Sequence, residues 1–330
     1  MLSLKGKKVL VTGAGGFIGS HLTEKLLRAK AEVTAFLRYT SSGNMGQLRF
    51  LPLRLRKNIH LIYGDIRNQE DCLRAMEGVQ YVFHLAAQIA IPYSYIAPGD
   101  FLMVNAIGTV NMLQTARRLK IKKYVQVSTS EVYGTAQYVP IDENHPKVAQ
   151  SPYAASKIAA DGVAESFYRS FDFPVVTVRP FNTYGPRQSA RAVIPAIILQ
   201  GLKGRIVNLG NTETRRDLNY VDDIANGMML GCFNKNTVGM TLNLASGKDY
   251  SIAEIVGFTG DILGKKLLVK RDKRRVRPKS SEVDRLVGDS GLAEKVMQYL
   301  PANDMLSGLE KTIRFFEENI DLYDREDYQI

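Results

Sequence analysis

The chain has 330 residues, of which 45% are hydrophobic and 23% charged, and its formal net charge is +11. This length allows a large buried core and predicts two lobes, and the composition is typical of a globular protein in solution. The positive charge suits a nucleic-acid-binding protein and an enzyme for phosphorylated substrates equally well, so it excludes neither class.

Three features bear on compartment and metals. No apolar run is long enough to span a bilayer, and residues 1–8 lack the apolar core of a signal peptide. The two cysteines, Cys72 and Cys232, lie far apart and form no metal or redox motif. We therefore expect a reduced, cytoplasmic protein that binds neither a membrane nor a metal.

The first predicted element is an apolar stretch at residues 8–12, which is typical of a buried parallel strand. Glycines follow at Gly13, Gly16 and Gly19, and a helix is predicted over 20–29. Glycine permits a tight turn and a close approach of the backbone to a pyrophosphate at the helix N-terminus. A plain turn would also use glycine, but the place between strand and helix favours dinucleotide binding. The expected contacts are Gly13, Gly16, Phe17, Ile18 and Gly19.

The second strand, predicted over 32–37, is informative at its end. Folds of this type that prefer NAD usually place an acid there, to hold the ribose hydroxyls. Here Arg38 and several hydroxyl residues follow, and no acid. This favours NADP, because an arginine can accommodate its 2′-phosphate; the alternative is that Arg38 only stacks on adenine.

Strands and helices continue to alternate after this point. Strands are predicted over 59–63, 81–87 and 124–128, and helices over 69–76 and 101–119. This order implies a parallel, doubly wound sheet of the Rossmann type. Asp65 and Ile66 follow one strand and are expected near the adenine, whereas Leu85, Ala86 and Ala87 leave room for the cofactor. His84, within an apolar strand, is expected to be a packed core histidine.

The strand at 124–128 leads into Thr129, Ser130 and Glu131. Because the carboxyl ends of parallel strands face the ligand crevice, a hydroxyl and a carboxylate emerge beside the cofactor. Thr129 could hydrogen-bond a substrate hydroxyl and Glu131 could move a proton. Taken alone, the hydroxyls would equally suit an ordinary turn.

A helix is predicted to begin after Ser151, a good N-cap, with Pro152 at its first position. Apolar residues recur along it at helical spacing and predict a buried stripe: Ala160, Ala164, Phe167 and Phe171. Tyr153 and Lys157 are one turn apart and share a face of this helix. A lysine ammonium near a tyrosine hydroxyl favours the phenolate, which would give Tyr153 a lowered pKa and make it a usable base. A lone pair of this kind is usually a solvated surface feature; its combination with Thr129 and Glu131 indicates a catalytic site.

These motifs together resemble the extended short-chain dehydrogenase/reductase superfamily, in its nucleotide-sugar epimerase/dehydratase branch. The resemblance covers nearly the whole chain, including residues 179–187 and 215–223. It implies that Asn182 and Arg187 contact the sugar nucleotide and that Arg216 binds its phosphates. Residues 277–286 are similar to a segment of the GDP-mannose dehydratases, which implies that Arg277 grips the pyrophosphate and Glu282 the nucleotide ribose.

The residues around Glu131 separate subfamilies within the branch. Epimerases generally lack this glutamate, 4,6-dehydratases have an acid here, and UDP-glucuronate decarboxylases share Ser-Glu. Ser130 stands where glucose-type dehydratases have aspartate, as in GDP-mannose dehydratases. Residues 90–95, 134–140 and 188–195 are most similar to dehydratases of legionaminic acid synthesis, which act on nucleotide-activated N-acetylglucosamine.

The resemblance implies a nucleotide-sugar 4,6-dehydratase that makes a 4-keto-6-deoxy sugar by internal hydride transfer. Tyr153, assisted by Lys157 and Thr129, would take the proton from the carbon-4 hydroxyl. Glu131, beside Ser130, would remove the carbon-5 proton and assist loss of water from carbon 6. NADP or NAD would stay tightly bound and be recycled. The alternatives are a UDP-glucuronate decarboxylase, a 4-epimerase, and a non-catalytic NADP-binding regulator.

Domain organisation and assembly complete the expectations. Residues 1–179, with about 218–246, should form the NAD(P)-binding lobe, and 180–217 with 247–330 a smaller α/β substrate lobe. The basic run at 265–277 would suit nucleic acid if read alone; we expect a solvated face with one or two residues turned to the nucleotide, and no nucleic-acid partner. A homodimer is implied by resemblance.

Overall fold

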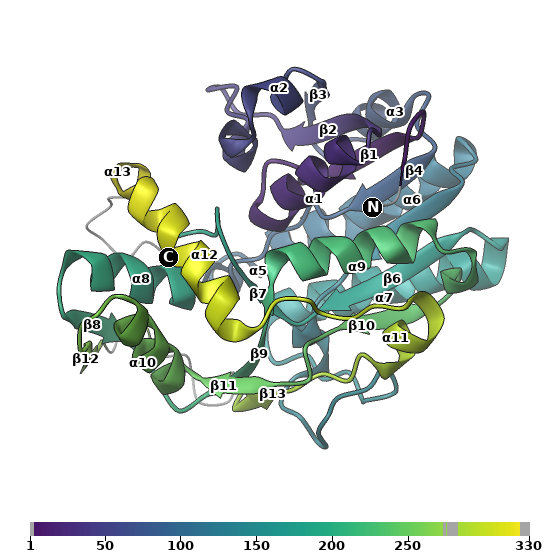
Figure 1. Ribbon diagram of the computed structural model, residues 1–330. Helices are drawn as coiled ribbons and strands as arrows, with labels where there is room; N and C mark the ends of the chain where they lie inside the picture. The colour runs from purple at the N-terminus through teal and green to yellow at the C-terminus, as the bar shows by residue number, and fades with distance from the viewer. Residues whose placement is uncertain (1–2, 273–274, 276–282, 324–330) are drawn as a thin grey trace.

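The computed structural model describes residues 3–272, 275 and 283–323 (Figure 1). Its centre is a seven-stranded parallel sheet in the order β10-β6-β5-β4-β1-β2-β3. The strands are β1 (Lys8–Thr12), β2 (Glu32–Arg38), β3 (Ile59–Gly64), β4 (Tyr81–His84), β5 (Lys123–Val127), β6 (Val175–Pro180) and β10 (Thr241–Leu244). The predicted doubly wound α/β fold is confirmed.

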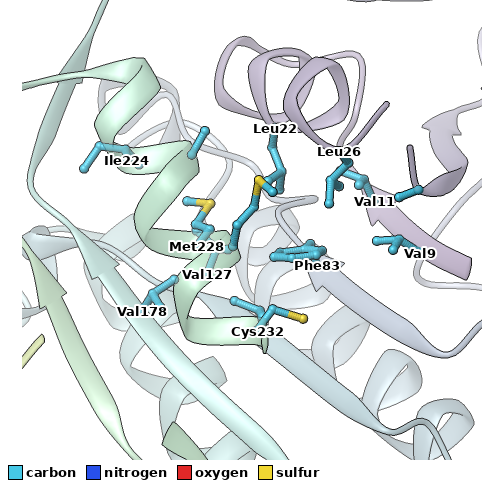
Figure 2. Close-up of a cluster of buried hydrophobic side chains, with 14 of the residues drawn as sticks. Val9, Val11, Leu22, Leu26, Phe83, Val127, Val178, Ile224, Met228 and Cys232 are labelled. Atoms are coloured by element: carbon cyan, nitrogen blue, oxygen red, sulfur yellow. The ribbon is translucent and has the colours of Figure 1, made fainter. Parts of the chain in front are cut away.

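Helices cover both faces of this sheet. One face packs against α1 (Phe17–Arg28) and α9 (Val221–Phe233), which lie side by side in front of the strands in Figure 1. Figure 2 shows the apolar core beneath them, where Leu22 and Leu26 of α1 and Met228 of α9 meet Phe83 of β4. The other face packs against α3 (Gln69–Met76), α6 (Gly108–Arg118) and α7 (Pro152–Phe171). Burial on both faces explains why the strand sequences are almost continuously apolar.

The remaining strands build smaller sheets beside the carboxyl ends of the large one. Strands β7 (Asn182–Tyr184), β9 (Arg215–Tyr220), β11 (Asp249–Ser251) and β13 (Arg285–Leu286) form a four-stranded sheet, and β8 (Ile206–Leu209) pairs with β12 (Leu268–Arg271). Around them pack α8 (Val193–Lys203), α10 (Ile252–Ile262) and α12 (Met305–Glu318), with a separate apolar core. We propose that this part is the substrate lobe, with the boundaries predicted from the sequence.

Short helical segments connect these elements. They are η1 (Gly46–Phe50), α2 (Leu53–Arg56), α4 (Ile91–Ser94), α5 (Pro98–Phe101), η2 (Leu102–Ile107), η3 (Ser130–Tyr133), η4 (Lys235–Thr237), α11 (Gly291–Met297) and α13 (Ile320–Tyr323). The predicted helix over 101–119 therefore contains a π-helical part, η2, before α6. Among the described residues, no helix combines the length and the apolar character needed to cross a membrane.

Helix α7 begins as predicted, because the Ser151 hydroxyl accepts a hydrogen bond from the Ala154 amide (3.1 Å) and Pro152 occupies the first position. Ala160, Ala164 and Phe167 are buried as expected. Phe171 is not: its side chain is 47% exposed and lies under the Arg117 guanidinium, 4.0 Å from the ring centroid. The expected apolar stripe thus ends one turn before the helix does.

Candidate active site

A cavity of about 610 Å³ lies at the carboxyl ends of the large sheet's strands. Every predicted cofactor and catalytic residue lines it, as does Asn182: Gly13, Gly16, Phe17, Ile18, Gly19, Arg38, Asp65, Ile66, Leu85, Ala86, Ala87, Thr129, Ser130, Glu131, Tyr153, Lys157. The structure therefore brings together residues from β1, β2, β3, β4, β5 and α7. This is the crevice in which open α/β sheets bind ligands.

The glycine loop is shaped to admit a dinucleotide. Gly13 has φ +68°, and a Cβ there would lie 2.9 Å from the amide nitrogen of Ala86. A Cβ on Gly19 would overlap the carbonyl oxygen of Gly13. Helix α1 starts at Gly16 with no side-chain cap and no acidic residue in its first turn. Its free amides and positive dipole end are thus available to a pyrophosphate.

Charged residues line the cavity at the ends of β2 and β3, where a smaller cavity of about 460 Å³ adjoins it. Asp65 accepts hydrogen bonds from Arg67 at both carboxylate oxygens, and this pairing lowers the pKa of Asp65. Arg74 pairs with Asp71 at 2.8 Å. Arg38 is exposed at the end of β2 and lines both cavities. Asp65 and Asp71 are thus paired with Arg67 and Arg74, and Arg38 adds a third positive charge, which also acts on Asp65.

The turn after β5 places the polar groups of η3. The Thr129 hydroxyl accepts a hydrogen bond from the Glu131 amide (3.2 Å) and so caps the N-terminus of η3. Ser130 is buried, whereas Glu131 is half-buried. The buried Ser128 hydroxyl has no hydrogen-bond partner among the described residues, and it lines the cavity. In the described part of the chain, the Ser128 hydroxyl is therefore an unpaired polar group that a ligand in the cavity could satisfy.

Helix α7 places Tyr153 and Lys157 beside this turn, where both side chains are buried and both residues line the cavity. The Tyr153 ring packs edge-on against Phe101, with centroids 6.2 Å apart. The Lys157 ammonium donates to the carbonyl of Val127 at 2.7 Å, which ties the helix to the end of β5.

The predicted lowering of the Tyr153 pKa is wrong for this structure. Burial raises the pKa of Tyr153 well above its ordinary value, and Thr129 opposes this only in part. Burial also lowers the pKa of Lys157 to about 8. The physical reason is that both groups lie in an apolar wall, where desolvation disfavours each charged form.

Two polar side chains from the substrate side also face the cavity. The Asn182 Oδ1 and Gln188 Oε1 atoms are buried and without hydrogen-bond partners among the described residues, and both residues line the cavity. Such orphaned acceptors are costly unless a ligand or water satisfies them. Gln188 was not singled out from the sequence, although it lies directly after the recognised 179–187 segment.

Other predicted substrate residues lie elsewhere. The Arg187 guanidinium pairs with Glu24 of α1 at 2.5 Å, and Arg187 does not line the cavity. Arg216 is buried within β9 and donates to the carbonyl of Arg215 at 3.0 Å. The structure thus brings neither arginine into the cavity, because ion pairing and strand burial place their side chains. Arg277 and Glu282 lie outside the described residues.

The structure also shows where His84 and part of the basic run lie, to neither of which a catalytic role was assigned. His84 is a core residue: its Nδ1 atom lies 2.9 Å from the Thr12 hydroxyl and its Nε2 atom 3.2 Å from that of Thr109. Of the basic run, Lys266, Lys270 and Arg271 are exposed and none of them lines the cavity. In the described part of the chain, no cluster of three or more His, Cys, Asp or Glu side chains could hold a metal ion.

The sequence was compared with known families. The family model for GDP-mannose 4,6-dehydratase matches residues 10–312. The chain belongs to this family of NAD-dependent nucleotide-sugar epimerases and dehydratases. The resemblance identified from the sequence motifs is thereby confirmed, and with it membership of a family of NAD-dependent enzymes that includes 4,6-dehydratases.

Individual relatives include both kinds of enzyme. A putative UDP-glucose 4-epimerase from Methanocaldococcus jannaschii is 30% identical over 94% of this chain and 99% of its own. A dTDP-glucose 4,6-dehydratase from Streptomyces antibioticus is 28% identical over 94% of this chain and 92% of its own. The crystal structure of DesIV, a dTDP-glucose 4,6-dehydratase from Streptomyces venezuelae with NAD bound, is similar with a TM-score of 0.85. That structure is 29% identical and covers 96% of this chain and 98% of its own.

The residues of this family member fit the cofactor. A side chain at Gly13 or Gly19 would clash with the backbone of Ala86 or of Gly13 and would prevent this tight loop, and the first turn of α1 lacks competing acids. The residues that line the cavity extend from Arg38, at the end of β2, to Tyr153, in the first turn of α7. NAD or NADP is therefore the group these residues hold.

Proposed function

We propose that the protein is a 4,6-dehydratase for a UDP- or GDP-activated hexose, N-acetylglucosamine being the best candidate for the sugar. The product would be the 4-keto-6-deoxy sugar. The observation that carries the proposal is the presence of Glu131 in the same cavity as Thr129, Tyr153 and Lys157. A hydroxyl oxidation needs only the last three, whereas elimination of water also needs a group that can take a carbon-bound proton.

A nicotinamide cofactor held by the glycine loop and the strand ends would supply the redox chemistry, a hydride being taken from carbon 4 and returned to carbon 6. Tyr153 is the base for the carbon-4 hydroxyl, and Thr129 orients that hydroxyl. Because burial disfavours the Tyr153 phenolate, the Lys157 ammonium is needed to stabilise it. With a pKa of about 8, Lys157 is mostly protonated at neutral pH and can do so.

Glu131 carries out the elimination. A ketone at carbon 4 acidifies the hydrogen on carbon 5, because the charge can spread into an enolate. The Glu131 carboxylate removes this proton and then protonates the hydroxyl that leaves carbon 6. Ser130 replaces the second carboxyl group of glucose-type dehydratases, so Glu131 serves both as base and as acid. Each positioned acid or base contributes roughly 10²–10⁴-fold.

In this proposal, two polar groups that have no partner within the described part of the chain take part in substrate binding. Asn182 and Gln188 present buried, unsatisfied amide oxygens to the cavity from the side of the substrate lobe. A sugar nucleotide offers hydroxyl donors for both. Arg216, Arg277 and Glu282 keep their proposed contacts with the nucleotide; Arg216 would have to leave its present hydrogen bond to reach one.

The experiment that tests the proposal measures the mass of the product and the deuterium that it carries. Incubation with a panel of UDP-, GDP- and dTDP-sugars in deuterated water should give a product lighter by one water that carries deuterium at carbon 5. Glu131→Gln keeps the shape but cannot accept the proton, so reduced nicotinamide absorbance should accumulate while water loss falls at least about 10²-fold. Glu165→Gln, an exposed position of α7, is the matched control.

Other products would select the alternatives. A product of unchanged mass with inverted carbon 4 would identify a 4-epimerase, the activity named for the Methanocaldococcus relative. Release of carbon dioxide from a UDP-uronic acid would identify a decarboxylase. Undiminished water loss in Glu131→Gln would remove this residue from the mechanism.

A further inference from the structure

Behind the cavity lies a chain of buried polar side chains that the proposed mechanism does not use. Arg179 of β6 donates from Nε to Asp161 of α7 at 3.1 Å, and both side chains are only 4% exposed. The Arg179 Nη1 group also donates to the Tyr133 hydroxyl at 2.9 Å. None of the three residues lines the cavity.

The chain continues beyond Tyr133. The Tyr133 hydroxyl donates to Asn243 Oδ1 of β10 at 2.7 Å, and the Asn243 side chain donates to the carbonyl of Ile141 at 3.0 Å. The Asn243 backbone amide in turn donates to Glu143 at 2.7 Å. Tyr133 is fully buried, so its hydroxyl has exchanged water for these two partners.

The position of this chain relates it to the reaction. Asp161 follows Lys157 by one turn of α7, and Tyr133 is the last residue of η3, two residues after Glu131. We propose that Asp161, Arg179 and Tyr133 are positioning residues: their hydrogen bonds fix the helix that carries Tyr153 and Lys157 against the turn that carries Ser130 and Glu131. In its catalytic part this inference rests on the proposed function.

A contribution to folding stability does not by itself explain the buried hydrogen bonds among Asp161, Arg179 and Tyr133. A buried ion pair is often no more stabilising than apolar residues of the same volume, since desolvation offsets the attraction. The Asp161 Oδ1 atom also lacks a hydrogen-bond partner among the described residues. Its charge instead acts on the site, because Asp161 raises the pKa of both Lys157 and Tyr153.

The oxidation and elimination steps both depend on the position of α7 relative to η3. Oxidation uses groups on α7, and elimination uses Glu131 on η3. A displacement of about 1 Å can cost on the order of 10²-fold in rate. Loosening the Tyr133 end should therefore impair elimination more than oxidation, and removing the Asp161 charge should move the pH dependence of oxidation.

The first test is Tyr133→Phe, which removes one hydroxyl and keeps the ring against Phe181. Tyr124→Phe is the matched control, because Tyr124 is equally buried and its hydroxyl has no hydrogen-bond partner among the described residues. In hydrogen-exchange mass spectrometry, peptides covering 128–134 should exchange about tenfold faster in Tyr133→Phe only. Water loss should fall about tenfold while carbon-4 oxidation changes by less than about threefold.

The second test is Asp161→Asn, which keeps an acceptor for Arg179. Among the described residues, the charged groups that act on Lys157 and Tyr153 come from several elements. Asp161 on the same helix acts on both, His84 on β4 interacts with Lys157, and Glu131 on η3 acts on Tyr153. Arg179 on β6 is paired with Asp161. Loss of a negative charge lowers the pKa of Lys157 and of Tyr153 alike, so both limbs of the pH profile for oxidation should move about one unit toward lower pH. Asp223→Asn, at a buried carboxylate of α9, should leave the profile in place.

The outcomes separate this inference from the proposed function. Unchanged exchange of 128–134 in Tyr133→Phe overturns the inference whether or not the wild type is a dehydratase. An unshifted pH profile in Asp161→Asn, or equal losses of oxidation and elimination in Tyr133→Phe, overturns its catalytic part. A wild type that eliminates no water, with faster exchange in Tyr133→Phe, retains the structural link and refutes the proposed function.

Discussion

Tyr153 and Lys157 lie one turn apart, and burial acts on them in opposite directions. It raises the pKa of the phenol and lowers that of the ammonium to about 8, so both neutral forms are favoured. Tyr153 can act as a base only if Lys157 keeps its positive charge at this buried position. Asp161 contributes to this by raising the pKa of Lys157, and the Val127 carbonyl by accepting its hydrogen bond.

The role of Tyr153 gives the first prediction. Tyr153→Phe should fold normally, because the ring and its packing on Phe101 remain, but turnover should fall at least about 10²-fold. Steady-state kinetics with the identified sugar nucleotide provide the measurement, and Tyr168→Phe on the exposed side of α7 provides the control. Near-normal turnover would show that another group accepts the proton.

The second prediction concerns the role of Arg38 in cofactor binding. It lies at the end of β2, where no acid is present to hold a ribose, and it adjoins the smaller cavity. A charge-assisted contact with the 2′-phosphate should make Arg38→Ala lose about tenfold or more in affinity for NADP, with less than about twofold for NAD. Calorimetric titration measures both. Arg74→Ala is the control, since Arg74 is already paired with Asp71; equal losses for both cofactors would mean that Arg38 stacks on adenine.

At the scale of elements, the sequence predicted those whose patterns are local. Strands β1 to β5 and helix α3 follow from apolar runs and turn residues, and their ends agree to within about three residues. The residues predicted to bind the cofactor also line one cavity, because strand ends and the glycine loop place them there; their contacts with a cofactor stay a prediction. The π-helical turn η2 was not predicted, since its hydrogen-bond pattern leaves no distinct periodicity. Arg187 was misplaced because its partner, Glu24, is 163 residues away in sequence.

Helix α7 supports a prediction at this scale. The Ser151 hydroxyl satisfies the Ala154 amide, one of the unpaired donors at the helix start, two residues before Tyr153. Ser151→Ala should lower the free energy of unfolding by about 1 kcal/mol, measured by urea denaturation. Ser166→Ala is the control, because the exposed Ser166 hydroxyl only bonds within the helix. A loss no larger than that of the control would mean that the cap contributes nothing.

At the scale of the whole molecule, polar side chains link elements that are distant in sequence. Arg187 of the substrate side pairs with Glu24 of α1, and Asp217 of β9 accepts amide hydrogen bonds from Gly247 and Gly288. Lys123 of the large sheet donates to Thr237 beyond α9. The fold thus contains buried charged groups whose hydrogen bonds depend on their protonation state.

His84 illustrates how such a group makes stability depend on pH. Its imidazole bridges β1 and α6: the Thr12 hydroxyl already accepts from the amides of Leu85 and Ala86, so its own proton is directed to His84 Nδ1. The ring must then donate from Nε2 to Thr109, whose hydroxyl donates to the carbonyl of Asn105. This network fits a neutral imidazole, and burial lowers the pKa of His84 from 6.5 to about 3.

The lowered pKa of His84 fixes the sign of the pH effect. Between pH 6.5 and about 3 the unfolded chain binds a proton on His84 that the folded chain excludes, so stability is fully present above pH 6.5 and is lost as the pH falls. At pH 5 the loss should be about 2 kcal/mol relative to pH 7.5. Urea unfolding of the wild type and of His84→Gln at both pH values measures it: the difference between the two proteins should shrink by this amount at pH 5. His60→Gln, at an exposed position, should follow the wild type. If His84→Gln loses as much stability between the two pH values as the wild type does, then His84 is not the group that the fold keeps neutral.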